Sequence, residues 1–455
     1  MSIHPRPNPA FLSALAGAIL SGDAAVDAIV DRVSRTLGRP WRWIRPMAQR
    51  YVERLARGVR LRRREVVAFL RSDEGLQRAW AKRGNDLRIV DWLAAPPEMQ
   101  PAPKAAQWQV PAIESEGALA AWLGVTAGEL EWFADLKRLA ARRSEQKLWH
   151  YSYRILAKNY GSIRLIESPK PRLKDAQRKI LTRILERIPT HTAAHGFVKG
   201  RSIKTFAAPH VGRRVVLRMD LRDFFPSIRS GRVQALFRTA GYPERVANLL
   251  GGLCTNATPR GVWRDASSGA CSGVGSGVGP LMVHEARQRY AWPHLPQGAP
   301  SSPALANLCA YRVDCRLSGL ARAAGAVYTR YADDLAFSGD DQFDRGVERF
   351  AAHAAAVLLE EGFEVHHRKT RIMRRGVRQH LAGVVTNERV NVVRADFDLL
   401  KATLTNCVKH GPASQNREGH PEFRLHLAGR ISFVETINPQ KGTRLRRIFE
   451  KIEWD

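Results

Sequence analysis

Three carboxylates, at two separate places in the chain, could together do metal chemistry. Asp333 and Asp334 are adjacent and lie between the strand-like runs VYTR and LAFSG, a pattern that predicts the tip of a β-hairpin. Asp220 follows the aliphatic run VVLRM, so we expect it at the end of a strand that faces this tip. Such a cluster is stable only with cations, and its hard oxygen ligands suit Mg²⁺.

A cluster of this kind would support nucleotidyl transfer. Two metal ions about 4 Å apart can activate a 3′-hydroxyl group and stabilise the leaving pyrophosphate. The pair Asp333-Asp334 alone is weak support, because adjacent aspartates also occur in ordinary turns. The separate Asp220 is the observation that favours the metal interpretation.

Three motifs resemble those of the reverse transcriptase family. They are MDLRDFFPSI around Asp220, LPQGAPSSP at 295–303 and YADD at 331–334, in the order and spacing of that family's palm domain. The resemblance extends over roughly residues 110–440. It implies an α+β fold, the right-hand polymerase with fingers, palm and thumb. It also implies an RNA-directed DNA polymerase that uses dNTPs.

The resemblance assigns catalytic roles. Asp220 and Asp333 would coordinate two Mg²⁺ ions, for which Mn²⁺ is a possible substitute, with Asp334 alongside them. Leu221 would offer its backbone carbonyl to a metal. Lys369, in the run HHRKT, resembles the lysine that protonates pyrophosphate, and a solvated lysine is the alternative.

The resemblance also implies a nucleotide site. Phe225 resembles the gate that excludes a nucleotide 2′-hydroxyl group, with a core aromatic residue as the alternative. Gln297 and Gly298 would pack near the incoming nucleotide and the template, where a glycine allows close backbone approach. Arg164, with Lys158 near it, resembles the fingers residues that hold the triphosphate, and an ordinary surface arginine is the alternative.

Two further segments resemble the bacterial retron enzymes in particular. They are HGFVKGRSIKTFAAPHVG and RQHLAGVVTNERVNVVR, and by this resemblance His210 and Gly383 would take part in RNA recognition. Phe206 stands where retron enzymes have Asn, and Leu381-Ala382 stands where they have Val-Thr. These departures concern RNA recognition and leave the polymerase motifs unchanged. His210 could instead be a packing histidine.

A retron enzyme would copy part of a structured noncoding RNA into single-stranded DNA. Priming would use a 2′-hydroxyl group of the same RNA and leave a branched RNA–DNA molecule. Such systems are associated with defence against phages, so an effector protein is a possible partner. The alternatives are another bacterial defence reverse transcriptase, a group II intron-type enzyme, or a catalytically idle RNA-binding scaffold.

The remaining chain must position these residues. Helical periodicity and basic residues predict a helical N-terminal extension, and a Pro/Ala-rich run predicts a linker after it. Thr126 and Glu129 have the spacing of a capping box. Two strands joined by a turn at 159–161 are expected in the fingers, and a Gly/Ser-rich surface loop at 266–280. We therefore predict an extension at 1–95, a linker at 96–110, a helical lead-in at 111–149, fingers at 150–215, palm at 216–383 and thumb at 384–455.

Composition limits the class of protein. The 455 residues include 73 Lys plus Arg against 43 Asp plus Glu, a net charge of +30, which favours a nucleic-acid partner. No run of 18 apolar residues occurs, so we expect no membrane association. Five cysteines, without CxxC spacing, favour a reducing cytoplasm over a disulfide framework or a zinc site.

Overall fold

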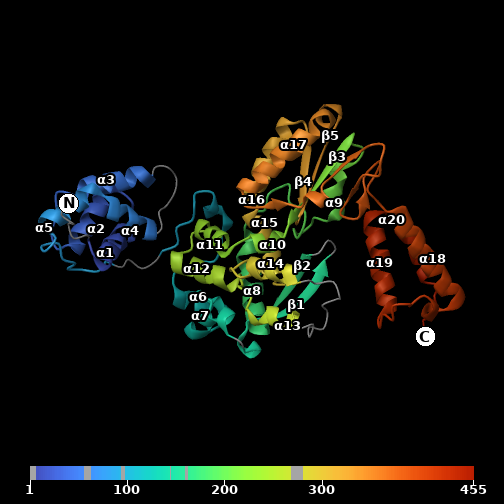
Figure 1. Ribbon diagram of the computed structural model, residues 1–455, viewed down its shortest axis with the longest axis horizontal. Coiled ribbons are helices and arrows are strands. Elements are labelled where there is room, and N and C mark those ends of the chain that lie inside the picture. The colour runs from blue at the N-terminus through green and yellow to red at the C-terminus, as the bar shows by residue number, and fades with distance from the viewer. Residues whose placement is uncertain are drawn as a thin grey trace. The chain divides into compact units, whose positions relative to one another are not determined.

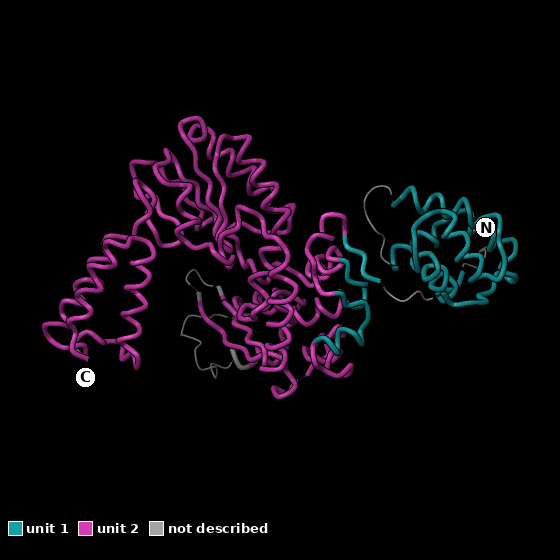
Figure 2. Tube along the Cα trace, turned by 180° about the vertical axis from the view of Figure 1, so that it is seen from behind, with its two compact units in different colours: residues 1–101, 112–122, 241–247 teal, residues 102–111, 123–240, 248–455 magenta. Residues whose placement is uncertain are grey.

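The computed structural model describes residues 7–55, 63–93, 98–143, 145–158, 162–267 and 280–454. The chain divides into two compact units, which Figure 2 shows in different colours. Unit 1 comprises Met1–Pro101, Ala112–Trp122 and Gly241–Ala247, and unit 2 comprises Ala102–Pro111, Leu123–Ala240 and Asn248–Asp455. The turn predicted at 159–161 and most of the loop predicted at 266–280 lie outside the described residues.

Unit 1 begins with the predicted helical region. Its helices are α1 (Pro9–Leu20), α2 (Val26–Thr36), α3 (Ile44–Leu55), α4 (Arg63–Ser72) and α5 (Glu74–Arg83). Asn8 caps α1 by accepting a hydrogen bond from the Phe11 N–H at 2.7 Å. Apolar side chains of all five helices form one buried core, with Leu15, Ile29 and Leu70 fully buried. The helical character expected for this region is confirmed.

Unit 2 contains most of the remaining helices. The predicted capping box is present, because Thr126 and Glu129 exchange side chain-to-backbone hydrogen bonds of 3.2 and 3.0 Å at the start of α7. From α6, which begins in unit 1, the helices are α6 (Glu116–Leu123), α7 (Ala127–Ala134), α8 (Pro171–Arg183), α9 (Ile203–Ala207), α10 (Phe224–Ser227), α11 (Ser230–Thr239), α12 (Glu244–Leu253), α13 (Gly261–Ser267), α14 (Pro280–Tyr290), α15 (Ser302–Cys309), α16 (Tyr311–Ala323), α17 (Asp341–Glu360), α18 (Arg394–His410), α19 (Phe423–Ile437) and α20 (Pro439–Phe449).

A two-stranded sheet precedes the central one. Strands β1 (Tyr151–Lys158) and β2 (Ser162–Pro169) pair antiparallel along their whole length. One face buries Ile155 and Leu165 against the tryptophan of α13, Trp263. The two strands predicted for this region are confirmed.

The central sheet carries two of the three motifs. Its order is β4 (Val327–Tyr331), β5 (Asp334–Gly339), β3 (Val215–Arg222), β6 (Glu364–Val365), and β7 (Arg371–Arg374) also pairs with β3. All of these pairings are antiparallel. Helix α17 packs against β3 and β5, and α16 against β4, as Figure 1 shows. The strand that carries Asp220 continues for two residues beyond it, because β6 pairs with its last two residues.

The C-terminal part consists of a small sheet and three helices. Strands β8 (His380–Leu381), β9 (Val384–Val385) and β10 (Asn391–Val392) form the sheet, and α18, α19 and α20 follow. The helices share a buried core that includes Leu404, Leu427 and Leu445. Among the residues described, no helix has the length and apolar character needed to cross a membrane.

Candidate active site

The YADD motif forms a tight hairpin tip, as predicted. Tyr331 pairs with Asp334, and the two residues between them make the turn. Ala332 has a φ of +55°, a conformation that an L-residue adopts only when its surroundings hold it. Gly196 lies directly against this turn, because a Cβ atom at its position would lie 2.6 Å from the Ala332 nitrogen. A glycine is therefore required there.

A buried ion pair stabilises the YADD hairpin. Arg330 and Asp314 are both fully buried and are joined by two hydrogen bonds of 2.7 Å. The same guanidinium group donates to the carbonyl of Ala332 at 3.0 Å and to the side chain of Asn307 at 3.1 Å. Asn307 in turn donates to the Gly196 carbonyl at 2.7 Å. This network holds the turn and the glycine segment together.

The sheet register brings the three aspartates to one place. Asp220 on β3 is the direct partner of Asp334 on β5, so the two residues are cross-strand neighbours. The Leu221 N–H donates to the backbone carbonyl of Asp333 at 2.9 Å, which ties the hairpin tip to β3. Leu221 itself is 2% exposed.

Two of the three carboxylates have basic partners. Lys369 Nζ lies 3.0 and 3.2 Å from the two oxygens of Asp220. Arg218 donates two hydrogen bonds to Asp334, at 3.0 and 2.8 Å. In the described part of the chain, no three acidic, histidine or cysteine side chains are arranged as a ready metal-binding group. The three-carboxylate cluster predicted from the sequence is thus a set of neighbouring positions, at which the side chains of Asp220 and Asp334 bind these bases.

The electrostatics of the site fit a cation. Burial raises the pKa of Asp333 to about 6, and the charges of Asp220 and Asp334 act in the same direction. Burial also raises the pKa of Asp334, although Arg218 opposes this effect. Three carboxylates that disfavour each other's charge are a donor set of hard oxygens, which suits a divalent ion.

The two adjacent phenylalanines have different environments. Phe224 is 3% exposed and packs against Phe363, with ring centroids 5.7 Å apart. Phe225 is half-buried and lies beside Phe197 at 6.2 Å. Phe225 is therefore the one with a ring surface available near the hairpin.

The LPQGAPSSP loop packs on β2. The Gln297 carbonyl accepts a hydrogen bond from the Glu167 N–H at 2.8 Å. Gly298 has a φ of +131°, and a Cβ atom there would lie 2.9 Å from the Glu167 carbonyl oxygen, so the loop needs this glycine. Arg164 is exposed on the same strand. Lys158 ends β1, and its side chain lies outside the described residues.

His210 is buried behind the central sheet residues Thr329 and Ser338. The ring is fully buried, with Nδ1 2.7 Å from the hydroxyl of Ser338 and Nε2 2.7 Å from that of Thr329. Burial lowers its pKa to about 3, so the ring is neutral. Direct RNA contact through this ring is therefore not available, and the packing alternative fits. Gly383 is exposed in the turn between β8 and β9, with a φ of +86°.

Two residues that the sequence analysis missed belong to this site. Arg218 lies two residues before Asp220, on the same face of β3, and the alternation of a strand could have indicated it. Phe197 is 53% exposed, has a φ of +58° and lies 6.4 Å from the Tyr331 ring. No sequence pattern would have indicated the strained backbone of Phe197.

Comparisons with known proteins agree with this geometry. Residues 156–386 match the family described as "Reverse transcriptase (RNA-dependent DNA polymerase)". The retron Mx65 reverse transcriptase of Myxococcus xanthus is 41% identical over 342 residues, 75% of this chain and 73% of that protein. The retron Mx162 reverse transcriptase of the same organism is 39% identical over 72% of this chain and 65% of its own length. The retron Ec86 reverse transcriptase of Escherichia coli is 28% identical over 64% of this chain and 77% of its own length.

The family follows from both kinds of observation. The match covers the central sheet, the hairpin and the loop that packs on β2, which are the parts that place the three aspartates. The chain belongs to the reverse transcriptase family, as a retron-type RNA-directed DNA polymerase with the right-hand polymerase fold.

Proposed function

We propose that this enzyme copies part of a structured noncoding RNA into single-stranded DNA, starting from a 2′-hydroxyl group of the same RNA. The product would be a branched RNA–DNA molecule. The observation that carries the proposal is the direct pairing of Asp220 with Asp334 beneath the Asp333 turn, in a chain whose relatives are retron reverse transcriptases. A role in defence against phages, in the cytoplasm and with an effector protein, is part of the same proposal.

Asp220, Asp333 and Asp334, with the carbonyl of Leu221, are the groups that would hold two Mg²⁺ ions, with Mn²⁺ as a substitute. Reverse transcriptases use divalent metal ions, and such ions supply positive charge to the attacking and leaving oxygens. Lys369 is the proton donor proposed for pyrophosphate. Its ammonium group is within hydrogen-bonding distance of Asp220, and so it is close to where a phosphate would lie.

The half-buried Phe225 is the proposed gate against ribonucleotides, because its ring has a free surface and that of Phe224 does not. Gln297 and Gly298 would line the nucleotide and template site. Arg164 and Lys158 would hold the triphosphate, and an exposed arginine on β2 is suited to bidentate phosphate contacts.

We also propose how the chain divides into fingers, palm and thumb. Residues 150–215 would be the fingers, 216–383 the palm and 384–455 the thumb, with 111–149 leading into the fingers. Residues 1–95 would form an extension that helps to hold the RNA, and the linker at 96–110 would follow this extension. Gly383 would face that RNA from the thumb side, and His210 would act only indirectly, through the packing of β4 and β5.

The test expresses the enzyme together with its upstream genomic flank. We expect one short DNA that stays attached to RNA after protease treatment and that a debranching enzyme releases, since the link would be a 2′–5′ phosphodiester. Asp333→Asn should eliminate the DNA and leave the RNA. Asp340→Asn, which changes an acid that is 76% exposed, is the matched control and should keep the product. DNA with a free 5′ end, or DNA linked to protein, would exclude this priming mode.

A further inference from the structure

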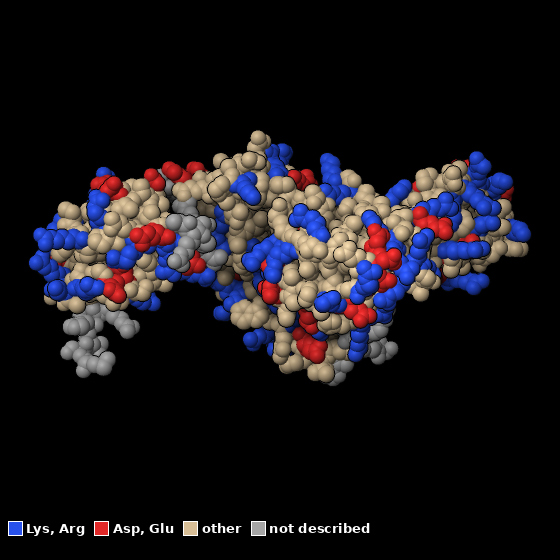
Figure 3. Space-filling model, turned by 90° about the horizontal axis from the view of Figure 1, so that it is seen from above, with Lys and Arg blue, Asp and Glu red and all other residues tan. Residues whose placement is uncertain are grey.

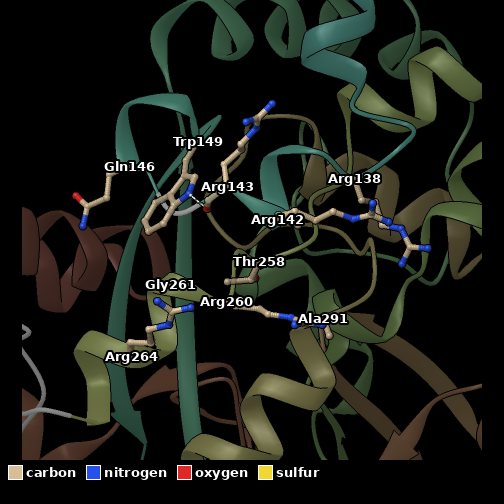
Figure 4. A pocket seen from close by; sticks show the side chains of 11 residues that line it. Arg138, Arg142, Arg143, Gln146, Trp149, Thr258, Arg260, Gly261, Arg264 and Ala291 are labelled. Atoms are coloured by element: carbon tan, nitrogen blue, oxygen red, sulfur yellow. Dashed lines mark hydrogen bonds between the residues drawn. The ribbon is translucent and has the colours of Figure 1, made fainter.

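A cavity of about 760 Å³ lies in unit 2, and none of its lining residues belongs to the site described above. Figure 4 shows that its walls come from the segment that leads into β1 and from the start of α13. Trp149 belongs to the first of these walls, and Thr258 lies between the two. Five of its lining residues are arginines: Arg138, Arg142, Arg143, Arg260 and Arg264. We call this cavity the arginine pocket.

The backbone that carries the first three arginines is held in place. Asp135 accepts hydrogen bonds from the N–H groups of Leu139 and Ala140, at 2.6 and 3.0 Å, and this fixes the turn that contains Arg138. The indole N–H of Trp149, a residue only 7% exposed, donates to the Arg143 carbonyl at 3.0 Å. A Cβ atom at Gly261 would lie 3.0 Å from the Trp149 ring, so α13 begins in close contact with this wall. The pocket is therefore preformed.

The pocket is strongly cationic. Its lining includes no aspartate or glutamate, and within the described residues none of its five arginines forms an ion pair. Asp135 is a nearby carboxylate whose charge interacts with Arg138 and Arg142, and both of its oxygens also accept backbone hydrogen bonds. On the face that Figure 3 shows, basic and acidic side chains are mixed. Five arginines around a concave surface, with Asp135 as the carboxylate that acts on two of them among the described residues, favour a bound polyanion.

Aromatic rings accompany the charge. The Arg138 guanidinium lies over the ring of Trp292, 4.8 Å from its centre, and Trp292 is 59% exposed. Trp292 follows the lining residue Ala291, and Trp149, which is only 7% exposed, itself lines the pocket. Arginines with interleaved aromatic residues are typical of surfaces that bind single-stranded nucleic acid, in which the bases can stack while the phosphates meet the cations.

We propose that the arginine pocket binds the phosphodiester backbone of a single RNA strand, away from the catalytic aspartates. A strand is favoured over a free phosphate because five arginines line a cavity of about 760 Å³, which is more than one phosphate can contact. The inference rests on the proposed function, since a folded RNA is the polyanion that such an enzyme must hold. The pocket would add a fixed point for the RNA that the polymerase site does not supply.

The test measures binding of labelled oligouridine RNA to the full chain by fluorescence anisotropy, without dNTPs, over a range of salt concentrations. The pocket variant is Arg142→Ala/Arg260→Ala, which removes one exposed arginine from each wall. The matched control is Arg322→Ala/Arg349→Ala, which removes two exposed arginines from α16 and α17. Thermal unfolding of both variants checks that they fold. Inorganic tripolyphosphate, at matched ionic strength, serves as a competitor.

We expect the pocket variant to bind oligouridine at least about tenfold more weakly than the control, with a log–log salt slope smaller by roughly 1.4 for two lost phosphate contacts. Arg142→Lys/Arg260→Lys should recover part of the affinity, because the charge is kept. An equal loss of RNA affinity in the pocket variant and the control would overturn the proposal. So would displacement of the RNA by tripolyphosphate from the unaltered chain but not from the pocket variant. The branched product made by the unaltered chain tests the proposed function separately: formation of that product, together with unchanged RNA binding in the pocket variant, would reject the pocket alone.

Discussion

Asp314→Asn should destabilise the sheet that carries the YADD hairpin. The Asp314 carboxylate and the Arg330 guanidinium are both fully buried and share two hydrogen bonds of 2.7 Å. The hydroxyl of Tyr328 donates to the same carboxylate at 2.8 Å. An asparagine would keep the shape of the side chain but would leave a buried guanidinium without its counter-charge.

The expected loss follows from that burial. Removing one partner of a buried ion pair costs about 3–5 kcal/mol of unfolding free energy, whereas an exposed pair contributes about 0–1 kcal/mol. Asp340, 76% exposed and 3.4 Å from Arg213, provides the exposed comparison. Because Arg330 also donates to the Ala332 carbonyl, Asp314→Asn should slow DNA synthesis as well.

The assay is urea unfolding followed by far-ultraviolet circular dichroism, with Asp314→Asn and Asp340→Asn measured side by side. Primer extension on an annealed template reports activity. A second variant, Asp314→Leu/Arg330→Met, should be more stable than Asp314→Asn, because it leaves no unpaired buried charge. If Asp314→Asn and Asp340→Asn differed by less than about 1 kcal/mol, the buried pair would not support the hairpin as argued.

Three further outcomes are expected. Phe225→Ala should raise ribonucleotide incorporation relative to deoxyribonucleotide, measured as the ratio of kcat/KM values, and an unchanged ratio in a folded variant would place the gate elsewhere. His210 has a pKa of about 3 in the folded chain against 6.5 in the unfolded chain. As the pH falls from 6.5 to 3, the unfolded chain therefore gains the proton first, and the free energy of unfolding falls by up to about 1.4 kcal/mol per pH unit. His210→Gln removes this group and should make that loss of stability less steep. Identical slopes would contradict the buried neutral ring. Gly196→Ala should lower both stability and DNA synthesis, because its Cβ atom would meet the Ala332 nitrogen at 2.6 Å, whereas Gly231→Ala has open space and should not; equal effects in unfolding and primer extension would count against the contact.

The local part of the site could be predicted from the sequence. The hairpin at Asp333 and Asp334 follows from two strand-like runs that flank a short turn, and the capping box at Thr126 follows from a spacing of three residues. Both depend only on neighbours in the chain. Gly298 was predicted to allow close approach of the nucleotide and template, which stays a prediction, and the structure adds that the Glu167 carbonyl lies against this glycine.

His210 could not be placed in the same way. Its motif resembles a retron segment linked to RNA recognition, but its two hydrogen-bond partners, Thr329 and Ser338, are 119 and 128 residues away in the chain. A sequence pattern gives no account of contacts at such separations. A buried histidine whose two ring nitrogens bond to residues of β4 and β5 can support a recognition surface through packing, without reaching that surface itself.

The basic partners of Asp220 and Asp334 also depend on contacts between distant parts of the chain, here on the register of the strands. Once Asp220 is known to lie opposite Asp334, Arg218 lies opposite Ala336, and Asp334 becomes its diagonal neighbour across the two strands. A long side chain reaches a diagonal neighbour easily, which explains the two hydrogen bonds between Arg218 and Asp334. Lys369 reaches Asp220 from the segment after β6, which pairs with the last two residues of β3. The residue types of the site are therefore encoded locally, whereas its charge balance is set by which strands pair and in what register.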